Sequence, residues 1–332
     1  MKIVKILILT ILTFFNSPLY SSEPSFDSWL ESFKIHALKN NISEKTFNKT
    51  MSNVVFLPKV IEYDLFQPEF YEDTKTYISK RTSKLKIIKG INLYKQNKNF
   101  INSIDKKFSI EKELLLALMG IETNFGTYVG KMDILSSLST LSFNKRRSAF
   151  FTKELITILQ LVENDIIDHR ILYGSWAGAF GNFQFMPTTI KNYAIDHDGD
   201  NIINLKSIED SFASAANYLN KIGWKKKQPC YYEVKLVDDV PLKFLNTSAK
   251  KIHNKKKFEH FRKYIIDGNN YDIDNNLITA IITPDKDIIL DSNNLKPAYI
   301  VFENYELILK WNRSLRFALA VCTLKDKFKN EL

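Results

Sequence analysis

A helical run of apolar residues that ends in an acid and two glycines constrains this chain more than any other feature. In "LLLALMGIETNFGTYVG", residues 114–130, Glu122 follows Leu118 by four positions and Leu115 by seven. All three side chains therefore share one face of a predicted helix. The helix is predicted to end in the loop that contains Gly126 and Gly130. Because a carboxylate is costly to bury, its place at the end of an apolar face needs a chemical explanation.

The distribution of glycine and of apolar periodicity predicts how the chain is organised. Eight of the ten glycines lie within 107–224, which marks a region whose loops need unusual backbone geometry. Apolar spacing is helical there and in the preceding segment, whereas "YYEVKLVDD" and "LITAIITPD" after Trp224 have the alternation of short strands. We therefore predict an α+β, mainly α fold. Its parts are an N-terminal helical region (23–106), a helical core (107–224), a small β-containing insertion (225–300) and a C-terminal helical segment (301–332).

The first 22 residues have the layout of a secretory signal peptide. Lys2 and Lys5 precede an uncharged run from Ile6 to Phe15, and the polar stretch "NSPLYSS" follows, with cleavage expected near Ser22. The apolar run is short for a membrane span. No cysteine follows it, so no lipid anchor on an N-terminal cysteine is expected. These features predict an exported, soluble, periplasmic protein; an uncleaved N-terminal anchor is the alternative.

The net charge of the chain indicates which kinds of surface it would bind. Without residues 1–22 the chain has 45 basic and 37 acidic residues, a net charge of +8, which favours polyanionic surfaces such as cell wall, acidic lipid or nucleic acid without choosing between them. The lysine-rich segment 249–264 is predicted to be a solvated helix, and no nucleic-acid partner is expected.

Cys230 and Cys322 are 92 positions apart without a disulfide-like context, so unpaired cysteines are favoured, although export permits a bridge.

The segment "DHDGDNIINLKSIED", residues 196–210, has the spacing of a calcium loop. Asn201 replaces the usual glycine at position 6, and Asn adopts the left-handed conformation more readily than most residues. Ser207 at position 12 cannot replace the usual glutamate, so a later acid must close the loop. An acidic surface turn without metal is the alternative. The predicted ligands are Asp196, Asp198, Asp200, the backbone carbonyl of Ile202 and Asp210.

Two other segments contain candidate ligand-binding residues, and carbohydrate would fit the first of them. In "YGSWAGAFGNFQFMPTTIKNYA", residues 173–194, small residues alternate with rings, and Ser175 and Gln184 are candidate hydrogen-bonding groups. A closely packed helix pair, which would have the same alternation of small residues and rings, is the alternative. Arg146 and Arg147 lie among phenylalanines in "SFNKRRSAFF", where a solvated helix start is the alternative. The chain has no G-x-S-x-G, P-loop or H-E-x-x-H motif, which argues against nucleophilic triads and zinc hydrolysis.

Taken together, these motifs resemble the membrane-bound lytic murein transglycosylase B family, which cleaves bacterial cell-wall glycan. The resemblance runs from "FDSWLESF" and "QPEF" through "GIETNFGTYVGKMDILSSLSTLSFNKRRSAFF" and "GSWAGAFGNFQFMPTTIKNYAIDHDGDNIINL" to "ANYLNKIGW" and "NYELILKWNRSLRFALAV". It implies a lysozyme-like core, Glu122 as the catalytic acid and base, and a 15-residue calcium loop closed by Asp210. The residues that it places along the sugar cleft are Arg146, Arg147, Phe150, Ser175, Gln184, Tyr218, Trp311, Asn312 and Phe317.

The resemblance also implies a mechanism with one carboxyl group. The charged form of a carboxyl group bordered by apolar side chains is disfavoured, so its pKa rises and it can donate a proton near neutral pH. Glu122 would cleave the bond between MurNAc and GlcNAc in peptidoglycan glycan strands and form 1,6-anhydroMurNAc. The protein is expected to be a monomer that needs no cofactor for catalysis and binds a structural Ca²⁺ ion. A hydrolytic lysozyme-type muramidase and a non-catalytic wall-binding protein are the alternatives.

Overall fold

The computed structural model describes residues 25–66, 72–286 and 295–332. The predicted signal peptide and the "QPEF" motif at 67–70 lie outside these ranges. Within them, no helix is both long and apolar enough to cross a membrane.

Among the described residues of the N-terminal part there are six α-helices. Hydroxyl and carboxylate side chains start several of them, because they accept the backbone N–H groups that a first helical turn leaves unpaired. Ser25, Ser43, Asp73 and Ser83 make such caps. The helices are α1 (Phe26–Lys39), α2 (Glu44–Met51), α3 (Pro58–Leu65), α4 (Thr74–Arg81), α5 (Lys84–Gln96) and α6 (Lys98–Phe108).

Helix α7 (Lys112–Thr123), in the middle of the chain, is buried at every position from Leu114 to Gly120 and packs against α5 and α6. Helices α8 and α9 lie against each other, and α10 packs on α9. A two-stranded antiparallel ribbon, β1 (Met132–Asp133) with β2 (Tyr173–Gly174), joins the loops on either side of this pair. The other helices are α8 (Ile134–Phe143), α9 (Ser148–Glu163), α10 (Pro187–Tyr193) and α11 (Ile208–Lys221).

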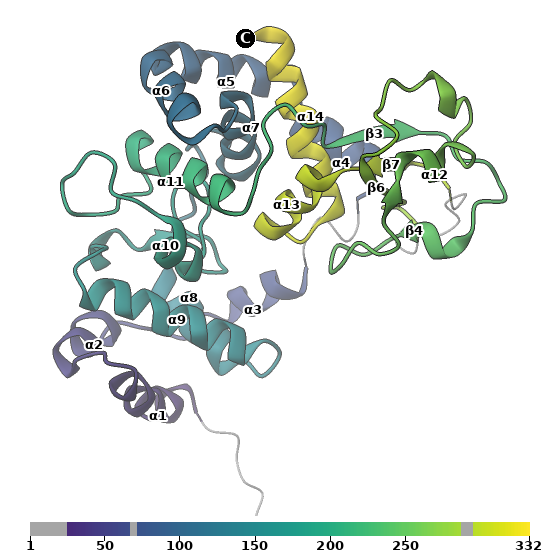
Figure 1. Ribbon diagram of the computed structural model, residues 1–332. Coiled ribbons are helices and arrows are strands. Elements are labelled where there is room, and N and C mark those ends of the chain that lie inside the picture. The colour runs from purple at the N-terminus through teal and green to yellow at the C-terminus, as the bar shows by residue number, and fades with distance from the viewer. Residues whose placement is uncertain (1–24, 67–71, 287–294) are drawn as a thin grey trace, which may run out of the picture.

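A small sheet lies to one side of the helices, with its own apolar core (Figure 1). Its strand order is β3-β7-β6-β4, with β5 paired to β6; β4 and β6 are parallel and the other pairs are antiparallel. The strands are β3 (Tyr231–Val234), β4 (Leu245–Asn246), β5 (Lys256–Lys257), β6 (Ile278–Ile282) and β7 (Ala298–Val301). The helix predicted over 249–264 is wrong in extent and exposure. Within this segment the helix is limited to α12 (Phe258–Arg262). It is not solvated, because Phe258 and Phe261 are fully buried in the sheet's core.

The last two helices, α13 (Glu303–Trp311) and α14 (Leu315–Glu331), return to the helical part. Helix α14 packs along α7 and also contacts α4 and α5, and it stands between α5 and the sheet (Figure 1). The fold is mainly helical with one small sheet, as the apolar periodicity predicted. The residue limits of the predicted domains stay predictions.

Cys230 and Cys322 form a disulfide, with their Cα atoms 6.1 Å apart. The preference for unpaired cysteines was therefore wrong. Sequence context did not reveal that the chain returns from the sheet to α14 and brings the two residues together. The bridge joins the segment before β3 to the middle of α14, so it closes a loop that contains the whole sheet.

Removing this bridge is expected to lower the free energy of unfolding, because the unfolded chain regains the conformational entropy that the cross-link removes. Losing a native disulfide typically costs about 2–5 kcal/mol. The double variant Cys230→Ala/Cys322→Ala should show this loss in denaturant unfolding, and wild-type protein in reductant should match it. Equal midpoints for oxidised and reduced wild-type protein would contradict the expectation.

Candidate active site

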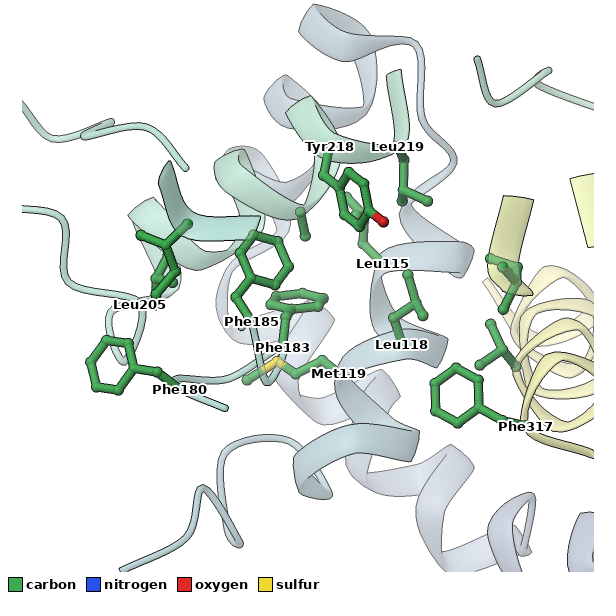
Figure 2. Packing of buried hydrophobic residues seen from close by; sticks show 14 of the residues in the cluster. Leu115, Leu118, Met119, Phe180, Phe183, Phe185, Leu205, Tyr218, Leu219 and Phe317 are labelled. Atoms are coloured by element: carbon green, nitrogen blue, oxygen red, sulfur yellow. The ribbon is translucent and has the colours of Figure 1, made fainter. Parts of the chain in front are cut away.

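Helix α7 places Glu122 in its last turn, where the buried part of the helix meets the surface. Leu115 and Leu118 are fully buried on the predicted face, whereas Glu122 is half-buried. Figure 2 shows the α7 side chains between the rings of Phe183 and Tyr218 on one side and α14 on the other. The acid therefore stands on a rigid element that is packed on both flanks.

The chain leaves α7 through three consecutive residues in the left-handed conformation. Asn124, Phe125 and Gly126 have φ values of +50°, +60° and +76°. This conformation is unfavourable for phenylalanine, and such strain persists only where the surroundings enforce it. The Phe125 ring is held in a niche that two glycines leave open. A Cβ atom would lie 2.7 Å from this ring at Gly120 and 2.8 Å from it at Gly90.

A buried hydrogen-bond relay joins this turn to the loops that follow it. The Thr123 hydroxyl donates to the Asn182 carbonyl at 2.8 Å and accepts the N–H of Gly126 at 3.0 Å. The Asn182 side chain, 3% exposed, donates to the carbonyl of Lys206 and to the hydroxyl of Ser211, each at 3.1 Å. Sequence reasoning missed Thr123 and Asn182, although both lie inside the quoted motifs.

Trp311 brings the C-terminal segment onto the acid. Its indole Nε1 donates to Oε1 of Glu122 at 3.1 Å, which confirms the predicted return of this segment. Its ring packs at 5.0 Å from the Tyr218 ring and 5.2 Å from the Phe185 ring, between centroids. A charge-neutral donor thus fixes one oxygen of the carboxyl group while aromatic rings hold the indole in place.

Tyr218 is fixed as a neutral hydrogen-bonding group beside this pair. Burial, with a smaller contribution from Tyr193, raises the pKa of Tyr218 to about 12, so the phenol stays protonated at neutral pH. Its hydroxyl donates to the carbonyl of Lys310 at 3.2 Å, next to Trp311 in the chain. Tyr218 therefore supports the position of Trp311 through this hydrogen bond to the neighbouring residue as well as through ring packing.

Ser175 and Gln184 both shape the loop between β2 and α10. The Ser175 hydroxyl accepts the N–H of Ala179 at 2.9 Å. Gln184, with φ of +50°, donates from its side chain to the carbonyls of Gly181 at 2.8 Å and Val129 at 3.2 Å. Both side chains are half-buried. The structure thus gives each predicted ligand-binding residue a role in holding its own loop.

Arg146 and Arg147 converge on Asp64 at the end of α3, a residue that the sequence analysis did not single out. The Asp64 side chain is 4% exposed and binds both guanidinium groups, with Arg147 at 2.8 Å. The arginine side chains themselves stay 49% and 41% exposed. The Arg147 guanidinium also lies 5.2 Å from the ring of Phe150, which is 43% exposed. The position of Asp64 just before the "QPEF" motif was the available signal.

The last two predicted cleft residues differ in exposure. Asn312 is half-buried and ends α13, donating its N–H to the carbonyl of Ile308 at 3.0 Å. Phe317 is 3% exposed and packs in the apolar core beside α7 (Figure 2). A ring this enclosed offers little surface to a ligand. Its predicted sugar contact stays a prediction that its burial argues against.

Three of the four predicted acidic calcium ligands come together. Carboxylate oxygens of Asp196, Asp198 and Asp210 lie within 4.8 Å of one another. Asp210 is fully buried and accepts the N–H groups of His197 at 2.7 Å and Asn204 at 2.8 Å, so it ties both ends of the loop to α11. Among the described residues, the carboxylate of Asp200 stands outside this group.

The donor set fits a hard divalent cation such as Ca²⁺. The N–H of Asp200 acts to lower the pKa of Asp198, but desolvation and the negative charges of Asp210 and Asp200 outweigh it and raise that pKa. A cation would relieve this repulsion. Asn201 has a φ of +70°, which confirms the conformation predicted for position 6. Ser207 instead caps α11, accepting the N–H of Asp210 at 3.1 Å.

The chain is similar to proteins of known identity. It is 39% identical to membrane-bound lytic murein transglycosylase B of Escherichia coli over 138 residues, which span 41% of this chain and 38% of that protein. The structure matches SltB3 of Pseudomonas aeruginosa in complex with NAG-anhNAM-pentapeptide, with a TM-score of 0.80, 29% identity and coverage of 92% of this chain and 80% of that one. It also matches an Escherichia coli lytic transglycosylase in complex with calcium, with a TM-score of 0.74, 24% identity and coverage of 94% and 95%.

These likenesses confirm the lysozyme-like helical fold that the sequence motifs implied. The family model of the transglycosylase SLT domain matches residues 25–326, which include all the candidate site residues. The chain therefore belongs to the transglycosylase SLT domain family.

Proposed function

We propose that this protein is a peptidoglycan lytic transglycosylase that cleaves the β-1,4 bond between MurNAc and GlcNAc and leaves 1,6-anhydroMurNAc. The observation that carries the proposal is a single half-buried acid, Glu122, held at a helix end by the indole of Trp311. Membership of the family supports it, as does the anhydro-sugar ligand in the SltB3 structure. The chain spans well under half the length of the curated relative, so the reaction is inferred for this chain from its own site.

One carboxyl group can perform both proton transfers of this reaction. Glu122 gives its proton to the glycosidic oxygen as the bond to C1 of MurNAc breaks, and GlcNAc departs as an alcohol. The N-acetyl oxygen of MurNAc stabilises the electron-poor C1. The Glu122 carboxylate then takes the proton of the MurNAc 6-hydroxyl, whose oxygen bonds to C1 and closes the ring. The enzyme ends protonated as it began, and no water is consumed.

The remaining site residues would bind the glycan. Exposed guanidinium groups and amide or hydroxyl groups suit sugar hydroxyls and carboxylates, and ring faces suit the apolar faces of sugars. The proposed binding residues are Arg146, Arg147, Phe150, Ser175, Gln184, Tyr218, Trp311 and Asn312.

Product analysis tests the proposed reaction. Mass spectrometry of purified peptidoglycan digested with the full protein should show 1,6-anhydroMurNAc ends. Reducing-end MurNAc as the sole product would make the protein a hydrolase, and binding without any cleavage would support the wall-binding alternative.

We infer that the acidic loop binds one structural calcium ion. Asp196, Asp198 and Asp210 would hold it, with Asp200 and the carbonyl of Ile202 completing the ligand set. The ion would neutralise the charges that repel one another in the loop and would thereby hold α11, which carries Tyr218, against the core.

Calcium is expected to raise the melting temperature of the wild-type protein relative to chelator, because a ligand that binds only the folded state stabilises it. At a concentration about 100 times the Kd the gain is about 2.7 kcal/mol. Asp210→Asn should lose this gain and the calcium signal in titration calorimetry. Glu209→Gln removes an exposed charge one residue away and should keep both. Identical wild-type melts with calcium and chelator, without calorimetric binding, would refute the site.

A wall-glycan substrate also requires export, in keeping with the predicted signal peptide at residues 1–22. We infer that the protein works in the periplasm as a monomer. N-terminal sequencing and light scattering of protein from the periplasmic fraction would test both, and an uncleaved or oligomeric form would contradict them.

A further inference from the structure

A partly buried lysine from another helix contacts the end of α7, and the proposed mechanism gives it no role. Lys86, on α5, donates from Nζ to the backbone carbonyl of Gly120 at 2.6 Å. Gly120 lies two residues before Glu122, in the same last turn of α7. A side chain from a distant part of the sequence therefore holds the backbone directly beside the acid.

The backbone N–H groups that follow α7 pass over this carbonyl. The N–H groups of Asn124 and Phe125 both donate to the carbonyl of Met119, and that of Tyr128 donates to Thr123. The carbonyl of Gly120 is thus bypassed where the chain turns left-handed. Carbonyls at a helix C-terminus carry partial negative charge, so a lysine ammonium is a favourable partner there.

The packing between α5 and α7 explains how Lys86 reaches this point. Lys86 and Gly90 are four residues apart, so they lie on the same face of α5. Because Gly90 has no side chain, the Phe125 ring fits between the two helices, beside Gly120. One turn along α5, Lys89 donates to the hydroxyl of Thr127, in the loop that follows α7. Helix α5 therefore holds both the helix end and the loop after it.

We propose that Lys86 is a positioning residue of the reaction, whose ammonium group caps α7 at Gly120 and so holds the carboxyl group of Glu122 in its reactive place. This inference rests on the proposed function and deepens it. Lys86 would not touch the glycan, and its effect would be on turnover rather than on binding. Misplacing a reacting group by about 1 Å can cost about 100-fold in rate, so a small shift of the helix end is enough.

The charge on Lys86 should make this support depend on pH. Burial, helped by the neighbouring cations Arg81 and Lys89, lowers the pKa of Lys86 to about 8. Of the helices that pack against α5, α14 carries a further cation, Lys327, which donates to the carbonyl of Thr82, and α7 carries Glu122. The ammonium form that caps the helix therefore prevails below about pH 8 and is lost as the pH rises through that value.

Two substitutions separate the cap from its charge. Lys86→Met removes both. Its kcat should fall by about 10- to 100-fold, because it loses a hydrogen bond that involves a charged group, and its KM should stay nearly unchanged. Lys86→Arg keeps a donor that stays charged, so its kcat should match wild type at pH 6–7. Above about pH 8 the ratio of Lys86→Arg to wild-type kcat should rise, and this ratio cancels any ionisation that the two proteins share. Lys95→Met, at an exposed position of the same helix, is the charge-matched control.

Amide hydrogen exchange at residues 123–127 reads the helix end without any activity. Lys86→Met should exchange faster there than wild type or Lys86→Arg, even if the glycan reaction proves to be different from the one proposed. Unchanged kcat and exchange in Lys86→Met would overturn the proposal. If that variant fails to fold, a pH-independent ratio between Lys86→Arg and wild type would overturn it instead.

Discussion

Glu122→Gln is expected to digest peptidoglycan at least about 10⁴-fold more slowly than wild type and to release almost no 1,6-anhydroMurNAc. General acid–base assistance is typically worth about 10² to 10⁴ in rate. The loss should reach the upper end or exceed it, because the same carboxyl group would serve both proton transfers. Glutamine keeps the size of the side chain and an oxygen that can accept the indole N–H of Trp311. The measurement is single-turnover release of anhydro-sugar ends, followed by mass spectrometry.

A second glutamate of α7 offers a matched control for this experiment. Glu113, in the first turn of the same helix, pairs with Lys112 at 2.8 Å. Glu113→Gln removes the same charge from the opposite end and should keep wild-type activity. Both variants should fold and bind calcium as wild type does. Full activity in Glu122→Gln would move the catalytic acid elsewhere, and equal losses in both variants would point to a general effect on α7.

The part of this site that is local in sequence was predictable. Helical periodicity placed Glu122 at the end of a buried face, because the positions of Leu115 and Leu118 fix that face by geometry alone. The aspartate spacing likewise predicted a loop that gathers carboxylates, because its residues are neighbours in the chain. The return of Trp311 to Glu122 was predictable only from the family resemblance, since 189 positions separate the two residues.

The parts that the sequence did not predict depend on contacts between distant segments. The disulfide joins residues 92 positions apart, and neither neighbourhood reports on the other. Asp64 was missed because its role becomes visible only when α3 lies beside Arg146 and Arg147. The burial of Phe317 follows from how α14 packs on α7, and the family resemblance does not determine the exposure of a side chain. The cap that Lys86 provides was missed because only the structure shows that the turn after α7 passes over the Gly120 carbonyl.

Trp311→Phe is expected to lower kcat by about 10- to 100-fold while leaving the fold intact. The substitution removes the indole N–H that binds Oε1 of Glu122 but keeps an aromatic ring against Tyr218 and Phe185. Glu122 is a carboxylate in the second proton transfer, and a hydrogen bond to a charged group is worth about 1.5–3 kcal/mol, which corresponds to this range of rates. Without it the carboxyl group can rotate, so fewer of its orientations suit proton transfer to the glycosidic oxygen.

The chain contains the same chemical pair at the other end of α7, which makes the test specific. The indole of Trp224 donates to Oε2 of Glu111 at 2.6 Å, and Glu111 begins the helix that Glu122 ends. Glu111 caps α7 and Glu122 lies in its last turn, so the two carboxyl groups stand on α-carbons about 16 Å apart along the helix. Trp224→Phe therefore removes an equivalent hydrogen bond far from the acid, and it should lower the melting temperature without a comparable loss of kcat. If the two variants lose kcat equally once the measurements are made below both melting transitions, Trp311 stabilises the helix and does not orient Glu122.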